Sequence, residues 1–116
     1  MTDIQQLILA ARPLIPFRRI HDAQAFLKLW PLEDQFALIS ALCIGRDHMG
    51  ANVIRPGYVA EDQSFDRFLH IGSTGIWLIM PEDFAGMLCE AGASLSEWFT
   101  AFEHCAEASG YELDEF

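Results

Sequence analysis

The length and composition of the chain are those of one globular domain. Its 116 residues are enough to bury a core, and 52% hydrophobic with 21% charged residues excludes intrinsic disorder as the main state. Seventeen Asp and Glu against seven Lys and Arg give a formal net charge of −10, which disfavours direct binding to nucleic acid or to an anionic membrane. We therefore expect a single domain over residues 1–116, without a nucleic-acid or membrane partner.

The charge is distributed unevenly along the chain. All seven basic residues lie at or before Arg67, whereas residues 68–116 carry nine carboxylates and no Lys or Arg. Excess negative charge keeps an apolar protein soluble, and it also attracts a basic partner. Both interpretations of the acidic half stay open.

The sequence shows no features typical of a membrane-spanning segment, a signal peptide or a disulfide framework. No apolar run approaches the ~20 residues of a membrane-spanning helix, and no basic segment precedes an apolar stretch at the start, so we expect no signal peptide. Cys43, Cys89 and Cys105 are odd in number and lack zinc-type spacing. The sequence therefore predicts reduced thiols, no metal, no cofactor and a cytoplasmic location.

The first half of the chain has three helical patterns. The first helix is predicted to begin after a cap at Thr2 and to end before Pro13. A second, short helix follows Asp22 as its cap and ends before Pro31. The stripe that the first helix buries consists of Ile4, Leu7, Ile8 and Ala11.

The strongest helical pattern covers residues 32–44. After its first turn, which holds Glu33 and Asp34, almost no polar residue remains on any face. A helix that is apolar nearly all round belongs at the centre of a fold. Gly45 is predicted to stop this helix in a left-handed conformation.

The middle of the chain indicates a loop and then β-structure. Residues 46–66 are irregular, with Gly and Pro at intervals. Residues 68–71 and 76–80 are two apolar, β-prone runs around Gly-Ser-Thr-Gly, a pattern typical of a β-hairpin. Residues 53–54 or 58–59 could supply a third strand.

Two more helices and a tail complete the prediction. Pro81 opens a helix that Gly92 closes, and the capping box Ser94…Glu97 opens the last helix. The tail, residues 111–116, is expected to be frayed. The predicted class is α+β and predominantly helical, with about five helices around a central buried helix and one β-hairpin.

Acidic residues on and after the last helix are the candidate partner-binding site. The candidates are Glu97, Glu103, Glu107, Glu112, Asp114 and Glu115. Tyr111 or Phe116 could add aromatic anchors. The leading prediction is a non-enzymatic inhibitor or immunity-type protein that binds a basic partner, such as a toxin or a nucleic-acid-handling enzyme.

The alternative is a small hydrolase or metal-dependent enzyme that uses Asp47 and His48. A carboxylate beside an imidazole in a loop can orient it as a base. A metal site built from His48, His70 and a loop carboxylate such as Asp62 or Asp66 is a variant of this hypothesis, although no spacing supports it. A third possibility is a homodimer that buries exposed apolar residues.

Two segments resemble a bacterial family of domains of unknown function. Residues 32–49 resemble its helix with the pattern Ala-Leu-x-Trp-Ile-Gly-Arg-Gly-Asp, and residues 80–95 resemble its closing Pro-Leu-Leu-x-Asp-Tyr segment. Cys43 stands where the family has tryptophan, and no glycine separates Arg46 from Asp47. The resemblance implies a bacterial or phage setting and assigns no activity and no site residue.

Overall fold

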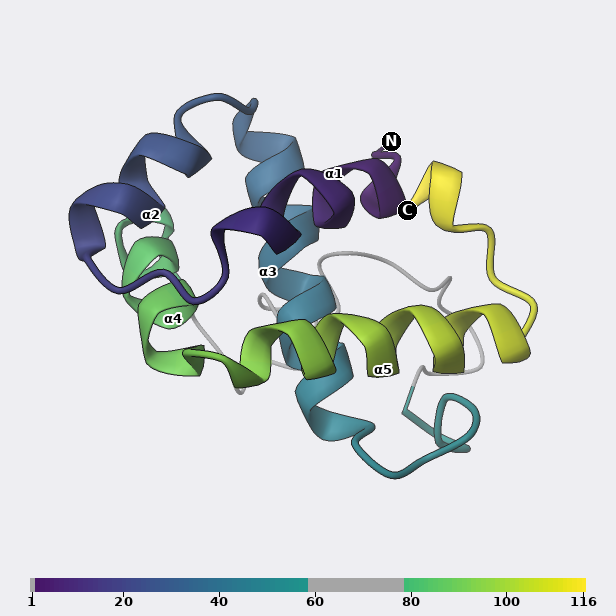
Figure 1. Cartoon of the computed structure of the whole chain (residues 1–116). Helices are drawn as coiled ribbons and strands as arrows, with labels where there is room; N and C mark the ends of the chain where they lie inside the picture. Colours follow the sequence, from purple (N-terminus) through teal and green to yellow (C-terminus); the bar gives the residue numbers. More distant parts are fainter. Residues whose placement is uncertain (1, 59–78) are drawn as a thin grey trace.

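The computed structural model describes residues 2–58 and 79–116, and five α-helices account for most of them (Figure 1). Three short 3₁₀ turns join or follow these helices: η1 (Arg12–Leu14), η2 (Pro81–Asp83) and η3 (Leu113–Glu115). The helices are α1 (Ile4–Ala11), α2 (Ile20–Leu27), α3 (Leu32–Asp47), α4 (Phe84–Ala91) and α5 (Ser94–Ala108). The predicted set of five helices is confirmed.

Helix α3 is the centre of the fold, as its apolar sequence predicts. Residues 37–45 are all buried, so every face of the helix is covered along this stretch. Figure 1 shows α3 running through the middle of the molecule, with α1 and α5 across it and α2 and α4 together at one side. The core is a single cluster to which all five helices contribute.

The predicted α+β class is wrong, because the described residues are mainly helical and contain no strand. Residues 68–78 of the expected hairpin lie outside the described residues, and Ile79 and Met80 belong to no strand. Residues 53–54 do not form one either. Instead, the N–H of Ile54 donates to Ser109 Oγ at 2.9 Å, so a hydroxyl at the end of α5 satisfies it in place of a neighbouring strand.

The predicted stop of the central helix at Gly45 is also wrong. Helix α3 continues through Gly45 to Asp47, and Gly45 serves a different purpose there. A Cβ at this position would lie 2.6 Å from the carbonyl carbon of Trp98 and closer still to its oxygen. Glycine therefore lets the backbones of α3 and α5 cross in direct contact.

Several helix starts differ from the expected caps by one to three residues. Asp3, not Thr2, caps α1 by accepting from the N–H of Gln6 at 3.3 Å. Thr2 is buried, and its hydroxyl donates to Asp34 Oδ1 at 2.7 Å. Asp22 lies in the first turn of α2 instead of before it. The expected capping box is absent, because α5 already begins at Ser94.

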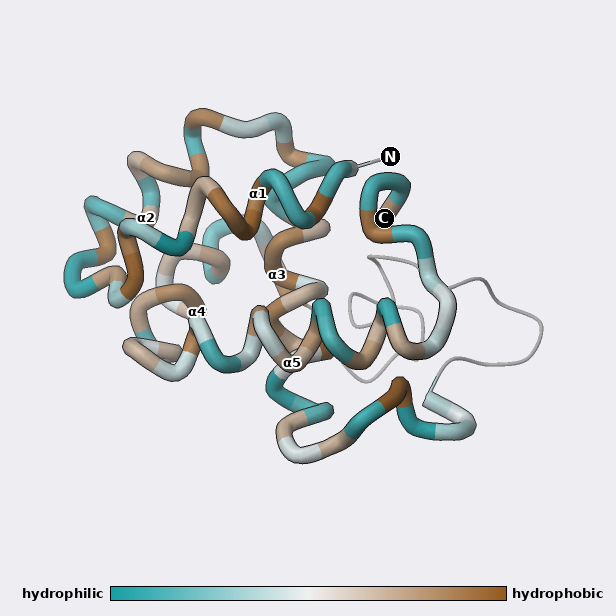
Figure 2. Tube along the Cα trace, turned by 45° about the vertical axis from the view of Figure 1, so that its right-hand side comes forward, coloured by the Kyte–Doolittle hydropathy of each residue, from teal (hydrophilic) through white to brown (hydrophobic). Residues whose placement is uncertain are grey.

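The tail is docked, not frayed. The N–H of Thr2 donates to the carbonyl of Phe116 at 3.2 Å, and the N–H of Phe116 donates back to Thr2 at 2.9 Å. Leu113 and Phe116 are each 4% exposed, and the Phe116 ring packs edge-on against Phe102 with centroids 5.2 Å apart. Figure 2 shows the two ends of the described chain beside each other. Burial of these two side chains outweighs the entropy of ordering the tail.

We predict that Gly45→Ala destabilises the fold by about 3 kcal/mol, because the added methyl meets backbone that cannot rotate away. Gly86→Ala in α4 is the matched control, since no atom outside its own stretch of helix lies within 4 Å of a Cβ there. The control should stabilise the protein by roughly 0.5–1 kcal/mol through helix propensity. Urea unfolding followed by circular dichroism measures both. Equal effects would contradict a backbone-to-backbone crossing at Gly45.

Candidate functional site

Four of the six predicted acidic residues gather where the tail meets the first and last helices. The backbone pair between Thr2 and Phe116 holds η3 beside the start of α1, and Gln5 Nε2 donates to Glu107 Oε1 at 2.8 Å. We call this surface the acidic end, and its members are all exposed. They are Asp3, Glu107, Glu112, Asp114 and Glu115. Figure 2 shows the tail coloured mostly as hydrophilic.

The carboxylates of the tail lie close enough to affect one another's protonation. A hydrogen bond with Glu112, together with the negative charges of Glu112 and Asp114, raises the pKa of Glu115 above its ordinary value of 4.5. Among the described residues, no Lys or Arg forms an ion pair with any member of the acidic end. The surface therefore carries mutual repulsion that its own neighbours do not offset.

The other two predicted residues lie elsewhere. Glu103 is half-buried, and its Oε1 accepts from Arg12 Nη2 at 2.7 Å. Arg12 also donates to the side chains of Ser96 and Thr100, so it joins the end of α1 to the outer face of α5. Glu97 is exposed in the first turn of α5, at the far end of that helix. Glu103 is therefore paired with Arg12 as part of the fold. Glu97 lies apart from the acidic end.

Sequence reasoning missed Asp3 as a member of this surface. Its position near the N-terminus suggested only a favourable charge at a helix start, and it does cap α1. The pairing of Thr2 with Phe116 then brings it next to the tail. No local pattern signals a contact between residues at opposite ends of the chain. Of the two proposed aromatic anchors, Phe116 is buried, and Tyr111 is half-buried against the core.

The Asp47–His48 pair does not form a catalytic arrangement. The imidazole of His48 is fully buried, with Nδ1 2.7 Å from the carbonyl oxygen of Ile44 and Nε2 3.0 Å from the backbone nitrogen of Arg55. A carbonyl can only accept and an N–H can only donate, so Nδ1 carries the proton and Nε2 is the acceptor. Both nitrogens are used, and neither faces solvent. His48 is thus a structural residue that ties the loop after α3 to the core.

Asp47 contacts Tyr58 and Arg46. Its carboxylate accepts from the hydroxyl of Tyr58 at 3.1 Å and lies 3.7 Å from Arg46 Nε. The ring of Tyr58 in turn packs edge-on against His48 with centroids 4.5 Å apart. These contacts order the loop and orient no base towards a substrate. Asp62, Asp66 and His70, named above for a metal site, lie outside the described residues, and residues 2–58 and 79–116 contain no cluster suited to a metal ion.

The three cysteines are free thiols in unreactive surroundings. Burial raises the pKa of Cys43 to about 11, and it also raises the pKa of Cys89 and Cys105. Cys105 lies with its Sγ 3.4 Å from the carbonyl of Ala51, whereas the adjacent His104 points to solvent. The consecutive Glu103, His104 and Cys105 therefore face different environments and form no nucleophile–base pair.

Comparisons with models of known families, with curated proteins and with solved structures find no match to this chain. The resemblance in residues 32–49 and 80–95 stays an expectation. Within residues 2–58 and 79–116, no helix has the length and continuous hydropathy that crossing a bilayer requires. Charge and geometry are thus the grounds for any functional proposal.

His48→Ala should destabilise the protein by about 3 kcal/mol, because it leaves a cavity and removes a partner from two buried backbone groups. The neighbouring Met49 is 48% exposed, so Met49→Ala should change the free energy of unfolding by less than about 0.5 kcal/mol. Chemical denaturation measures both. A His48 variant as stable as the Met49 variant would contradict the structural role.

Glu115 should titrate above 4.5, and Glu112→Gln should return its pKa towards that value, since the two carboxyl groups no longer compete for one proton. A carboxyl whose folded pKa is raised contributes stability that is present at acid pH and is lost as the pH rises through that pKa. The docked tail should therefore loosen slightly between pH 4.5 and neutrality. An NMR titration of side-chain carboxyl carbons measures the shift. An unchanged Glu115 pKa in the variant would show that Glu112 is not its partner.

Proposed function

We propose that this protein is a non-enzymatic binding module whose acidic end recognises a basic protein partner. The observation that carries the proposal is a set of five exposed carboxylates on a docked tail and the helix ends beside it, with no Lys or Arg paired to them among the described residues. A surface of this kind is prepared for a partner, since little conformational entropy is lost when the partner binds.

Electrostatics support a basic partner over a neutral one. The net charge of −10 steers cations towards the molecule at long range, and the repulsion among Glu112, Asp114 and Glu115 is relieved when Lys or Arg side chains approach. A partner that itself handles nucleic acid would present such side chains. An inhibitor or immunity-type protein of the cytoplasm, where free thiols persist, is the role that fits these properties.

Geometry disfavours the hydrolase alternative. A hydrolase needs a base that can reach a substrate, but both nitrogens of His48 form hydrogen bonds in the core. The three cysteines do not supply a nucleophile, because burial keeps them as thiols.

The test compares two triple variants of equal net charge. One neutralises the tail by Glu112→Gln, Asp114→Asn and Glu115→Gln. The other neutralises three exposed carboxylates near α4 by Glu82→Gln, Asp83→Asn and Glu90→Gln. Tagged proteins are used to capture partners from a lysate of the native host, eluted with a salt gradient and identified by mass spectrometry.

We expect the unaltered chain and the α4 variant to retain a basic protein that salt releases, because exposed charges are screened over about 10 Å at 0.1 M ionic strength. The tail variant should lose it. If both variants retain the partner equally, recognition through the acidic end is contradicted. If both lose the partner equally, binding depends on the net charge of the protein and not on the acidic end.

A further inference from the structure

The tail, residues 111–116, is attached to the rest of the fold at its far end. Gly110, with a φ of +84°, reverses the chain after α5. The tail is then anchored by the buried Leu113 and Phe116 and by the two backbone hydrogen bonds between Phe116 and Thr2. Every ordered residue costs conformational entropy, and a short segment with few buried side chains belongs to the parts of a protein that open first.

The surface on which the tail closes is formed by other elements. Thr2 is fixed from below, because its hydroxyl donates to Asp34 Oδ1 of α3 at 2.7 Å. The ring of Phe116 packs against Phe102 of α5, and Figure 1 shows η3 beside the start of α1. Helices α1 and α5 each pack on α3 without the help of the tail. The tail can therefore open while these helices stay folded.

Closing the tail brings carboxylates from three elements together. The turn η3 places Glu112 and Glu115 within hydrogen-bond reach of each other. Asp3 caps α1 directly after Thr2, and Glu107 lies in the last turn of α5. Glu107 has an uncharged donor, the side-chain amide of Gln5. Mutual repulsion among these carboxylates opposes the burial that holds the tail closed.

We propose that the tail is a latch that opens and closes as a unit on folded helices, and that neutralisation of its carboxylates keeps it closed. Salt acts on this balance by screening the repulsion over about 10 Å at 0.1 M. A basic partner acts in the same way, a step that rests on the proposed function. By reciprocity, the closed tail binds that partner more tightly than the open tail does.

Hydrogen–deuterium exchange at neutral pH tests the latch through the protection factors of the Thr2 and Phe116 amides, which form the two bonds of the closed state. The amide of Leu42, in the buried middle of α3, reports global unfolding. Raising NaCl from about 0.02 M to about 0.5 M should increase protection at both tail amides about threefold, because the repulsion is screened. Protection at Leu42 should stay within about twofold.

The two triple variants defined above separate the charge of the tail from the net charge of the protein. The tail variant should raise protection at Thr2 and Phe116 about tenfold at low salt and should no longer respond to NaCl. The α4 variant carries the same net charge and should stay within about twofold of the unaltered chain, because its substitutions lie away from the tail.

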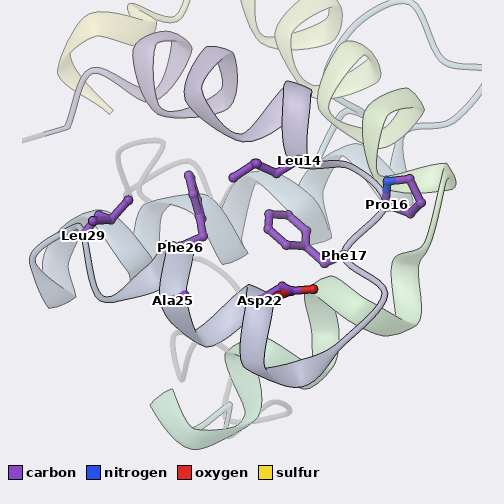
Figure 3. A pocket seen from close by; sticks show the side chains of 7 residues that line it. All are labelled: Leu14, Pro16, Phe17, Asp22, Ala25, Phe26 and Leu29. Carbon is purple, nitrogen blue, oxygen red and sulfur yellow. The ribbon is translucent and has the colours of Figure 1, made fainter.

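Phe116→Ala tests whether the tail opens as a unit. Loss of the buried ring should lower protection at Thr2 about tenfold and leave Leu42 unchanged. Leu29→Ala is the matched control, since Leu29 is 73% exposed and lines an open apolar hollow beside α2 (Figure 3), at the other side of the molecule from the tail. It should keep protection at Thr2 within about twofold.

Hexalysine is the probe for the link to a basic partner. It should raise protection at the tail amides of the unaltered chain, and it should bind Phe116→Ala about fivefold more weakly, although no charge has changed. Equal affinity for both chains would overturn the link. Hexalysine that fails to bind, while salt protects the tail, would contradict the proposed function and leave the latch in place. Tail amides that ignore both salt and the tail variant, or that exchange only together with Leu42, would overturn the latch itself.

Discussion

The close crossing of α3 and α5 at Gly45 is the constraint on which the rest of the structure depends. Because no Cβ stands between the helices, the backbone of α5 lies directly on α3 at Trp98, and the residues on both sides of this point fall into one core. Phe99, Phe102 and Cys105 become fully buried along α5 as a result. The same crossing sets the path of α5, so its C-terminal end lies where the tail can turn back towards α1.

The acidic end follows from that path. Once α5 is placed, Leu113 and Phe116 reach the core, and the tail closes on Thr2 through two backbone hydrogen bonds. When these two apolar side chains are buried, the acidic residues beside them, Glu112, Asp114 and Glu115, remain exposed. The same contacts that stabilise the tail thus hold its carboxylates together at the cost of mutual repulsion. A binding surface in which repulsion is built into a docked segment can release that energy when a cation arrives.

Two polar side chains secure the elements that apolar packing alone would leave loose. Arg12 reaches Ser96, Thr100 and Glu103 along α5, and it fixes the end of α1 there. His48 bridges two backbone groups in the core and holds the loop after α3. Each residue belongs to a type that sequence reasoning associates with function, and in each case the hydrogen bonds that the structure shows are made within the fold. The exposed carboxylates of the acidic end, in contrast, form no ion pair with Lys or Arg among the described residues, and the proposed function rests on them.

The sequence by itself determined the five helices and the central place of α3, because apolar spacing, proline positions and the absence of a polar face act within a few residues. It also indicated the acidic half from which most of the acidic end is drawn. The tertiary structure alone decided that α3 and α5 cross at Gly45, where the sequence predicted the end of a helix. It also decided that Glu103 is neutralised by Arg12, 91 positions earlier. It likewise brought Asp3 to the tail and corrected the expected α+β class to a mainly helical one. These outcomes depend on contacts between residues far apart in the chain. The local spacing of residues does not specify which distant backbone or side chain a given residue contacts in the folded protein.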